Sequence, residues 1–301
     1  MGKYHFTNSQ YTAFLNAIDP AGTNPNFVYN ESQGSNIRSG ISFTTGNVSG
    51  AKYAVRPNMG DKPVNYVSWF DAARVSNWLH NGAQTYGSSN NTVSAPQNNG
   101  AYTLGTATSG TAPAKNAGAK FYIPTENEWY KAAYYNPTLS GGAGGYRLYG
   151  NGFDSGIAAV TADSTGNGSA GTGIMGSGTG NFANYSNRAV WNGQAGNVTT
   201  VGTNGAASYY GAFDMSGNVS DWNDFDGMPG SSRGIRGGYW NSLASGVSSA
   251  NGVTDDPSGE ISGIGFRLAS PAPVPEPSTY AMALAGIACG GFSMWRRRKR
   301  A

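Results

Sequence analysis

Two long stretches rich in Gly, Asn, Ser and Thr, 82–118 and 141–180, limit how much regular structure this chain can form. Such segments bury little apolar surface, so they are typical of surface loops or insertions and not of a second domain. The whole sequence nevertheless contains 7 Trp, 18 Tyr and 12 Phe, more than a disordered chain usually carries. We therefore expect one irregular, loop-rich α+β domain over residues 1–270.

Three helices are predicted by the same signal, a hydroxyl residue followed three positions later by an acid or amide. These pairs are Thr7 with Gln10, Ser68 with Asp71, and Thr125 with Glu128. An apolar stripe with helical spacing follows each pair. The stripes are Tyr11, Phe14, Leu15 and Ile18; Ala72, Val75, Trp78 and Leu79; and Trp129, Ala132 and Ala133. Breaking signals at 19–20, 81–82 and 136–137 should end the helices.

Glu126 and Glu128 are close enough in sequence to suggest a pair of catalytic carboxylates. A helix start attracts acids through its dipole and its capping box, so we interpret both as helix-start residues. Three short runs, 120–123, 234–240 and 263–269, predict β-strands.

The sequence lacks the side chains for most thiol and metal chemistry. Its single cysteine, Cys289, lies in the apolar C-terminal tail, so residues 1–270 have no disulfide, thiolate metal site or cysteine nucleophile. Two histidines, His5 and His80, are too few for a histidine-based iron or zinc site.

The net charge of +3 comes from the C-terminal tail. Removing its five cations from 19 and its one acid from 16 leaves 14 Lys and Arg against 15 Asp and Glu, a net charge of −1. The domain itself is therefore close to neutral. Because nucleic-acid binding needs a basic surface, we expect no nucleic-acid partner.

The tail itself combines a linker, an uncharged segment and a basic cluster. The linker, 271–279, contains Pro275, Glu276 and Pro277. The segment 280–295 carries no charge, and at about 1.5 Å per helical residue the stretch 278–295 is about 27 Å long, just enough to span a bilayer. The cations of 296–301 should stay cytoplasmic, so the domain should face outward. They also disfavour a buried core helix, the alternative interpretation.

The span is short and contains three glycines, so it is a poor permanent anchor. The N-terminal sequence leads directly into a capped amphipathic helix and shows no secretory signal. Since an outward-facing domain needs such a signal, we expect either a start codon upstream of Met1 or a fragment, and we favour the former.

Six sequence blocks occur in the order seen in the formylglycine-generating enzyme (sulfatase-modifying factor) family, which this chain resembles. They are GKYHFTNSQYTAFLNA, PVNYVSWFDAARVSNWLHNG, FYIPTENEWYKAAYY, GAFDMSGNVSDWNDF, RGIRGGYWNS and GIGFRLA. The resemblance implies a variant of the C-type-lectin fold with little regular structure.

The tail resembles the PEP-CTERM sorting signal of Gram-negative bacteria. This resemblance implies that the tail is an address label and that membrane insertion is transient. An exosortase-type protease would cut near the Pro-Glu-Pro, and the domain would pass from the inner membrane to the cell surface or extracellular matrix.

The family resemblance also bears on catalysis. The oxidising enzymes of that family bind copper through two cysteines that follow the Gly-Gly block. In this sequence the matching positions are Ser242 and Val247. A hydroxyl is a poor ligand for a soft metal and valine offers no ligand atom. We therefore expect no copper, and no oxidase chemistry of that type.

A calcium site is implied where the family has Gly-Asn-Val-Trp-Glu-Trp and this chain reads 217–222. Its ligands would be Asn218, Val219 through its carbonyl, and Asp221, with Asn184 as the candidate for a second site. Oxygen donors suit calcium, but Asp is one methylene shorter than Glu and should weaken the site. The alternative for Asp221 is a turn or capping role.

Residues around the Gly-Gly block are candidates for lining a ligand groove. They are Tyr239, Trp240, Asn241 and Ser242. Core packing is the alternative for Trp240. Two functions follow: a non-catalytic exported module that binds peptide, glycan or matrix polymer, or a maturation enzyme with an active site that the sequence does not reveal.

Overall fold

The computed structural model describes residues 1–86 and 95–271. The predicted tail elements, including Pro275, Glu276, Pro277 and the span 280–295, lie outside the described residues. Within the described ranges, no helix has the length and apolar character needed to cross a membrane.

The three predicted capping boxes form and start the three longest helices of the described ranges. These are α1 (Asn8–Ile18), α3 (Trp69–His80) and α4 (Glu126–Tyr134). In each helix the cap hydroxyl accepts a hydrogen bond from the third residue's N–H, and that residue's side chain accepts one from the cap backbone. Shorter turns complete the helical part: α2 (Ser32–Ser35), η1 (Pro25–Phe27) and η2 (Ser140–Gly142).

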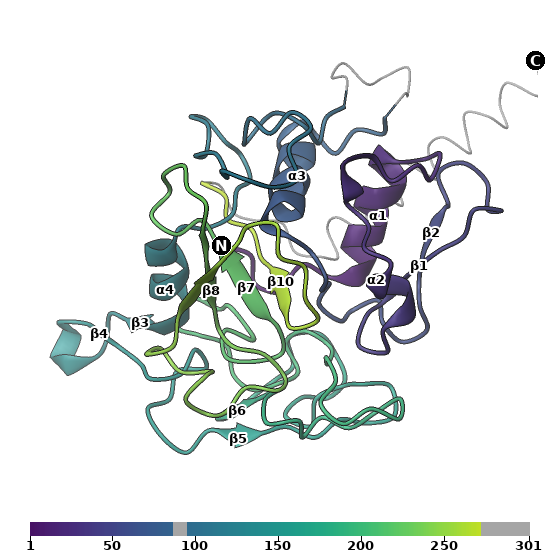
Figure 1. Cartoon of the computed structure of the whole chain (residues 1–301). Coiled ribbons are helices and arrows are strands. Elements are labelled where there is room, and N and C mark those ends of the chain that lie inside the picture. The colour runs from purple at the N-terminus through teal and green to yellow at the C-terminus, as the bar shows by residue number, and fades with distance from the viewer. Residues whose placement is uncertain (87–94, 272–301) are drawn as a thin grey trace, which may run out of the picture.

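A four-stranded sheet lies at the centre of the molecule, in the order β10-β7-β8-β9 (Figure 1). Its strands are β7 (Ser220–Asn223), β8 (Arg233–Arg236), β9 (Val253–Asp255) and β10 (Ile264–Phe266). β10 runs parallel to β7, and the other two pairings are antiparallel. In Figure 1 the helix α4 lies on one side of this sheet, and α1 with α2 lies on the other.

Two of the three predicted strand runs are shorter in the structure, and the third forms only one pairing. β8 ends at Arg236 because Gly237 and Gly238, with φ of +92° and +68°, turn the chain out of the sheet. Within the predicted run 263–269, only the residues of β10 form a strand. The run 120–123 forms no strand and contributes only the pairing of Tyr122 with Ala269.

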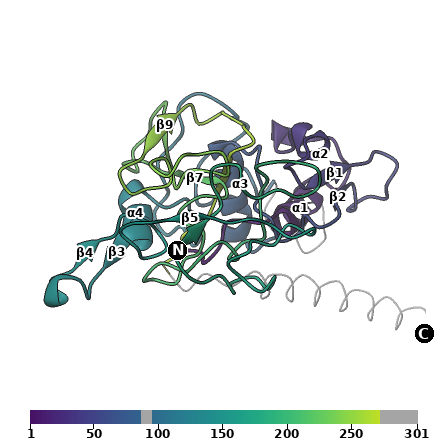
Figure 2. The ribbon, with the colours of Figure 1, turned by 90° about the horizontal axis from the view of Figure 1, so that it is seen from below.

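Three two-stranded sheets surround the central one. They are β1 (Ile41–Phe43) with β2 (Tyr53–Val55), β3 (Tyr135–Asn136) with β4 (Gly145–Tyr146), and β5 (Ala158–Ala159) with β6 (Phe182–Ala183). The β3–β4 pair projects from the body of the molecule in both ribbon views (Figures 1 and 2). Most of the remaining described chain is loop, as the composition predicts.

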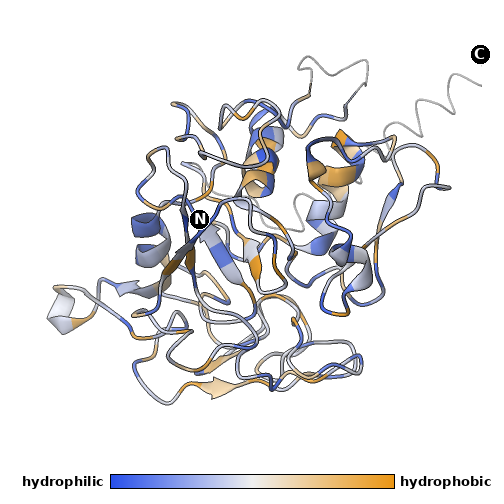
Figure 3. Cartoon of the chain, in the orientation of Figure 1, coloured by the Kyte–Doolittle hydropathy of each residue, from blue (hydrophilic) through white to orange (hydrophobic). Residues whose placement is uncertain are grey.

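The largest apolar cluster joins α1 and α3 to the central sheet. Phe14 of α1 meets Trp78 of α3 edge to face, with ring centroids 5.5 Å apart, and Tyr11 meets Phe266 of β10 at 6.5 Å. Hydropathy colouring shows apolar residues on α1, α3 and β10, whereas β7 is largely hydrophilic (Figure 3). All four residues of β7 are nevertheless buried, so the middle of the sheet is a polar interior.

The two ends of the domain lie side by side. Gly2 N donates to Leu268 O at 2.7 Å, and Phe6 N donates to Phe266 O at 2.9 Å. Phe6 in turn accepts from Val64 N at 2.9 Å. The N-terminal segment is thus held between β10 and the segment that precedes α3.

Two carboxyl groups meet where the 257–260 loop covers the start of α3. Trp69 N donates to Pro257 O at 2.9 Å, which holds the loop there. Asp71 is buried and accepts from Ser68 N and Ser68 Oγ at 2.8 and 2.7 Å. Burial, followed by the nearby Glu260 carboxyl, raises the pKa of Asp71 to about 7. Burial also raises the pKa of Glu260.

Asp71→Asn should make stability less dependent on pH. Because the folded-state pKa of Asp71 is about 7 against an ordinary value of 3.8, the folded protein keeps a proton that the unfolded chain releases. The free energy of unfolding should therefore fall between about pH 4 and pH 7, by up to about 1.4 kcal/mol per pH unit for one proton. Asparagine keeps an oxygen for Ser68 and cannot ionise. Urea unfolding from pH 4 to 8 measures the slope.

The exposed Asp255 provides the control, since Asp255→Asn should leave the slope unchanged. A slope that Asp71→Asn retains in full would show that another group takes up the proton.

Candidate functional site

Asp221 lies at the centre of a buried ion network. Its Oδ2 accepts from Arg267 Nε at 2.6 Å and from Trp129 Nε1 at 3.0 Å. The side chains of Asp221 and Arg267 are 1% and 0% exposed. Arg267 also donates through Nη2 to Phe213 O at 3.1 Å. The network therefore joins β7, α4, the end of β10 and the 213–214 segment.

His5 completes this network as a neutral residue. Its Nε2 lies 3.1 Å from Val219 O and 3.5 Å from Asp221 Oδ1. A carbonyl oxygen can only accept, so Nε2 carries the proton. Burial lowers the pKa of His5 to about 4, despite the opposing effect of Asp221. Asp221 therefore obtains its positive counter-charge from Arg267.

The predicted calcium ligands in 218–221 already have protein partners. Asp221 is paired with Arg267, Val219 O accepts from His5, and the Asn218 carbonyl accepts from Trp240 N at 3.0 Å. The Arg267 guanidinium lies 2.6 Å from Asp221 Oδ2, while Asp221 Oδ1 has no hydrogen-bond partner among the described residues. Asp221 is in a strand, so the capping role weighed as its alternative does not describe it either.

Asn184 lies in a different, oxygen-rich environment that includes Asn218. Its Nδ2 is surrounded by Asn197 O, Thr199 Oγ1 and Asn218 Oδ1, at 2.9, 3.0 and 3.2 Å. Its own Oδ1 is buried and has no hydrogen-bond partner among the described residues. A buried amide oxygen without a donor is free to bind a hard cation.

The four predicted groove residues follow the Gly237–Gly238 turn. Trp240 is 7% exposed, Tyr239 and Ser242 are half-buried and Asn241 is exposed. Backbone bonds fix the loop, since Ser186 N donates to Ser242 O at 3.0 Å and Asn187 N to Trp240 O at 2.8 Å. Asn241 also accepts from the Asn187 side chain. The loop is thus rigidly attached to the 186–187 turn.

Trp240 belongs to a small apolar cluster with Trp191, Met59, Val198 and Val219. The Arg38 guanidinium lies over its ring, 4.0 Å from the centroid. Core packing is therefore part of the role of Trp240, and its outer face is covered by a cation. Arg38 was not predicted, because nothing in its local sequence shows that it meets a residue 202 positions away.

The two positions that match the copper ligands differ in environment. Ser242 Oγ accepts from Tyr239 N at 3.0 Å and so stabilises the turn. Val247 is completely buried, in a cluster with Tyr149, Ala183 and Tyr185. One position is therefore a turn cap and the other a core residue. Within the described ranges, no three or more His, Cys, Asp or Glu side chains are grouped so that they could hold a metal ion.

Glu126 and Glu128 act structurally, as the sequence predicts. Glu128 caps α4 and accepts from Tyr122 Oη at 3.1 Å. Glu126 pairs with Arg236 through Oε1 and accepts from Asn223 Nδ2 at 2.8 Å. Its partners are two strands of the central sheet, so it fixes α4 against that sheet.

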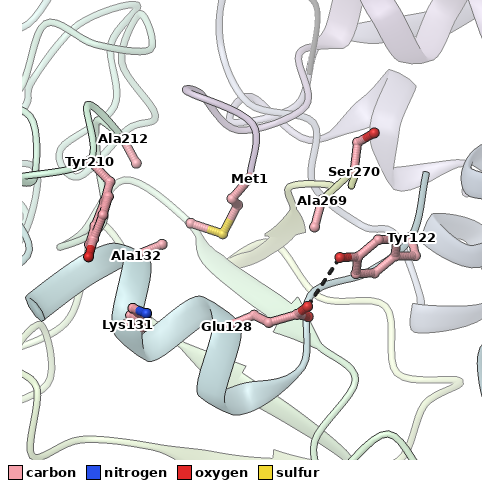
Figure 4. Close-up of a pocket in the computed structure, with 9 residues that line it drawn as sticks. All are labelled: Met1, Tyr122, Glu128, Lys131, Ala132, Tyr210, Ala212, Ala269 and Ser270. Atoms are coloured by element: carbon pink, nitrogen blue, oxygen red, sulfur yellow. Dashed lines mark hydrogen bonds between the residues drawn. The ribbon is translucent and has the colours of Figure 1, made fainter. Parts of the chain in front are cut away.

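A pocket of about 330 Å³ lies beside α4. Figure 4 shows Glu128, Lys131 and Ala132 of α4 along one side, with Met1 in the middle and Tyr122 hydrogen-bonded to Glu128. Tyr210, Ala212, Ala269 and Ser270 complete its lining. It shares no residue with the groove at 239–242.

A family model described as the sulfatase-modifying factor enzyme 1-like domain matches residues 1–272. The chain belongs to this family. A second model, the PEP-CTERM protein-sorting motif, matches residues 273–299. Both predicted resemblances are confirmed. The sorting motif indicates export to the cell envelope or surface and implies processing by an exosortase, a membrane protease.

Similar solved structures include the crystal structure of CarF, with 23% sequence identity over 90% of this chain and 85% of that chain, at a TM-score of 0.50. Treponema denticola variable protein 1 shares 19% identity over 89% of this chain and 82% of that chain, at 0.45. PvdO from Pseudomonas aeruginosa shares 17% over 88% and 77%, at 0.40. The likeness to CarF supports the mixed α/β fold alone. No curated protein matches this sulfatase-modifying-factor chain.

Arg267→Met should strongly destabilise the domain. The substitution leaves the buried Asp221 carboxylate without its counter-charge, and breaking a buried pair costs about 3–5 kcal/mol. The matched control is Arg147→Met, whose pair with Asp154 is partly exposed and should contribute less than about 1 kcal/mol. Chemical unfolding of both variants measures the difference. Equal losses would contradict the central role of the Asp221 network.

Proposed function

We propose that this protein is an exported, non-catalytic binding module that holds an extracellular ligand at the groove formed by 239–242. The observation that carries the proposal is the environment of Ser242 and Val247. The first closes a turn and the second fills an apolar cluster, at the two positions where the oxidising enzymes of the family hold copper. The loop-rich α+β domain would then use a C-type-lectin-like arrangement for binding.

Several features of the groove support binding. Its loop is fixed by hydrogen bonds to 186–187, so little conformational entropy is lost when a ligand arrives. An amide at Asn241, a phenol at Tyr239 and the Arg38 guanidinium over Trp240 provide polar groups beside aromatic surface. This mixture suits glycan, peptide or matrix polymer ligands.

The route to the ligand follows from the sorting motif. The segment 280–295 would enter the inner membrane transiently, with 296–301 on the cytoplasmic side. Cleavage near Pro275, Glu276 and Pro277 would then pass the domain to the cell surface or extracellular matrix. Its net charge close to zero does not provide the broad basic surface that nucleic acids bind.

The protein should not convert the cysteine of a sulfatase-type peptide to formylglycine, even with copper and oxygen supplied. This oxidation needs thiolates to hold copper(I), and residues 1–272 contain no cysteine. Mass spectrometry would detect the replacement of the thiol by an aldehyde. Conversion above the enzyme-free control would support instead the alternative, a maturation enzyme, and Ser242 would be the first residue to substitute.

Calcium is a separate proposal, at the Asn184–Asn218 pair. Rotation of the Asn184 amide would exchange Nδ2 for the unpartnered Oδ1, which would then lie beside Thr199 Oγ1 and Asn218 Oδ1, and these oxygens would hold the ion. When bound, calcium would rigidify the interior beneath the groove loop, because Asn218 O accepts from Trp240 N. It would take no part in bond making.

Calcium should raise the melting temperature of the wild-type protein relative to a chelator. A ligand that binds only the folded state adds about 2.7 kcal/mol when its concentration is 100 times Kd. Asn184→Ala should abolish this gain, and Asn184→Asp should enlarge it by adding a charged ligand. Scanning calorimetry with calcium, with magnesium and with chelator measures the effect. Identical wild-type melting curves in calcium and in chelator would remove the metal from the proposal.

A further inference from the structure

A second hollow lies next to the groove, and we call it the Trp191 pocket. Its volume is about 250 Å³, and its lining includes Ile37, Arg56, Asn58, Ser164, Trp191 and Asn192. Trp191 and Trp240 belong to the same apolar cluster. Ile37 precedes Arg38, the residue that covers Trp240. Trp191 of the pocket and Trp240 of the predicted groove therefore pack in one cluster, and Ile37 and Arg38 link the two sites along the chain.

These two sites carry two arginines that have no acidic partner. Arg56 Nη1 donates to Asn36 O and to Ser39 O, and Arg38 donates to Ala195 O and Gly196 O. Within the described ranges, no carboxylate oxygen lies within 4.0 Å of either guanidinium. By contrast, Arg233, Arg236 and Arg267 each hold a carboxylate. The carbonyl bonds orient both cations without neutralising them.

The nearest acid along the lining segment is already engaged. Asp163, beside Ser164, accepts from Thr165 N and Asn167 N, both at 2.9 Å, in a turn of its own. Lys62 lies over the Trp191 ring, 5.1 Å from the centroid, but it is buried and donates to Thr165 O and Thr200 Oγ1. The three cations Arg38, Arg56 and Lys62 outnumber the two carboxylates that face Lys62, Asp61 and Asp163, so an anionic ligand group would be attracted to the pocket.

Three residues of the lining, Asn58, Ser164 and Asn192, are neutral, polar and exposed, whereas Met59 and Trp191 are apolar and buried. Asn58 and Asn192 have φ of +62° and +52°, a backbone conformation that asparagine tolerates better than most residues. Each amide offers donors and acceptors, and Ser164 adds a hydroxyl. Such groups match the many hydroxyls of a sugar.

We infer that the Trp191 pocket binds a carboxylated or sulfated sugar unit of an extracellular polysaccharide, with Arg56 holding the anionic group. The inference rests on the proposed function, since it names the ligand class of the same binding face. A pocket of this volume takes one sugar unit, and the groove at 239–242 then contacts the neighbouring units of the chain. An acidic peptide has the same charge but few hydroxyls for the two amides.

The test is binding of the full chain, in mild detergent, to polygalacturonate and to neutral dextran, measured by affinity electrophoresis. We expect binding to polygalacturonate only, weakening as salt rises because the contact is between charges. Arg56→Gln should weaken it at least about tenfold, as expected for loss of one charge-assisted hydrogen-bond pair. Arg147→Gln, in an ion pair elsewhere, should bind like wild type.

Two further variants separate binding from folding. Arg56→Lys keeps the charge and should retain part of the affinity, while Asn192→Gly keeps the backbone conformation and removes an amide. Both should melt like wild type, and Asn192→Gly should still lose affinity.

Equal binding by Arg56→Gln and wild type would overturn the assignment of the pocket, and absence of binding to polygalacturonate would overturn the ligand class. Binding to dextran or to an acidic peptide in place of polygalacturonate would also overturn the ligand class. None of these outcomes would by itself contradict the proposed binding function. Formylglycine formation would contradict the function itself, so the two failures are distinguishable.

Discussion

The contact between Asp221 and Arg267 is the constraint on which the rest of the structure depends. An ion pair this deeply buried is stable only when both charges have further hydrogen bonds, and here the donors and acceptors come from distant parts of the chain. Trp129 places α4, His5 places the N-terminal segment, and Arg267 places the end of β10. The loops are long, but the elements they connect all contact this buried ion pair, whose hydrogen bonds require a fixed geometry.

This polar interior also separates the groove from the part of the domain that determines stability. Trp240, Arg38 and the Trp191 pocket lie on a face held by backbone hydrogen bonds and a small apolar cluster. The large apolar cluster, around α1, α3 and the sheet, does not include Trp240, Arg38 or Trp191. Substitutions on the proposed binding face should therefore leave the main core undisturbed.

The elements that local chemistry determines could be predicted from the sequence. A capping box and its apolar stripe act within one helix, and all three boxes form at the residues the pattern indicates. The six ordered blocks, read as a family resemblance, placed the groove loop. The partners of charged side chains could not be predicted, because Arg267 and Asp221 are 46 residues apart and Arg38 reaches a tryptophan in another block. The motif pointed to a metal at Asp221, whereas the fold supplies a guanidinium.

The side-by-side arrangement of Gly2–Phe6 with β10 sets the order in which the domain can fold. Residues 266–268 pair with the N-terminal segment, so these pairings cannot form until nearly the whole domain has been synthesised. Contacts between such distant residues make folding slow, because a large loop must close before any of them forms. The sorting motif begins at residue 273, immediately after those closing residues. A domain closed by its last residues cannot complete its fold while it is being made, and a translocation channel accepts chains whose fold is incomplete.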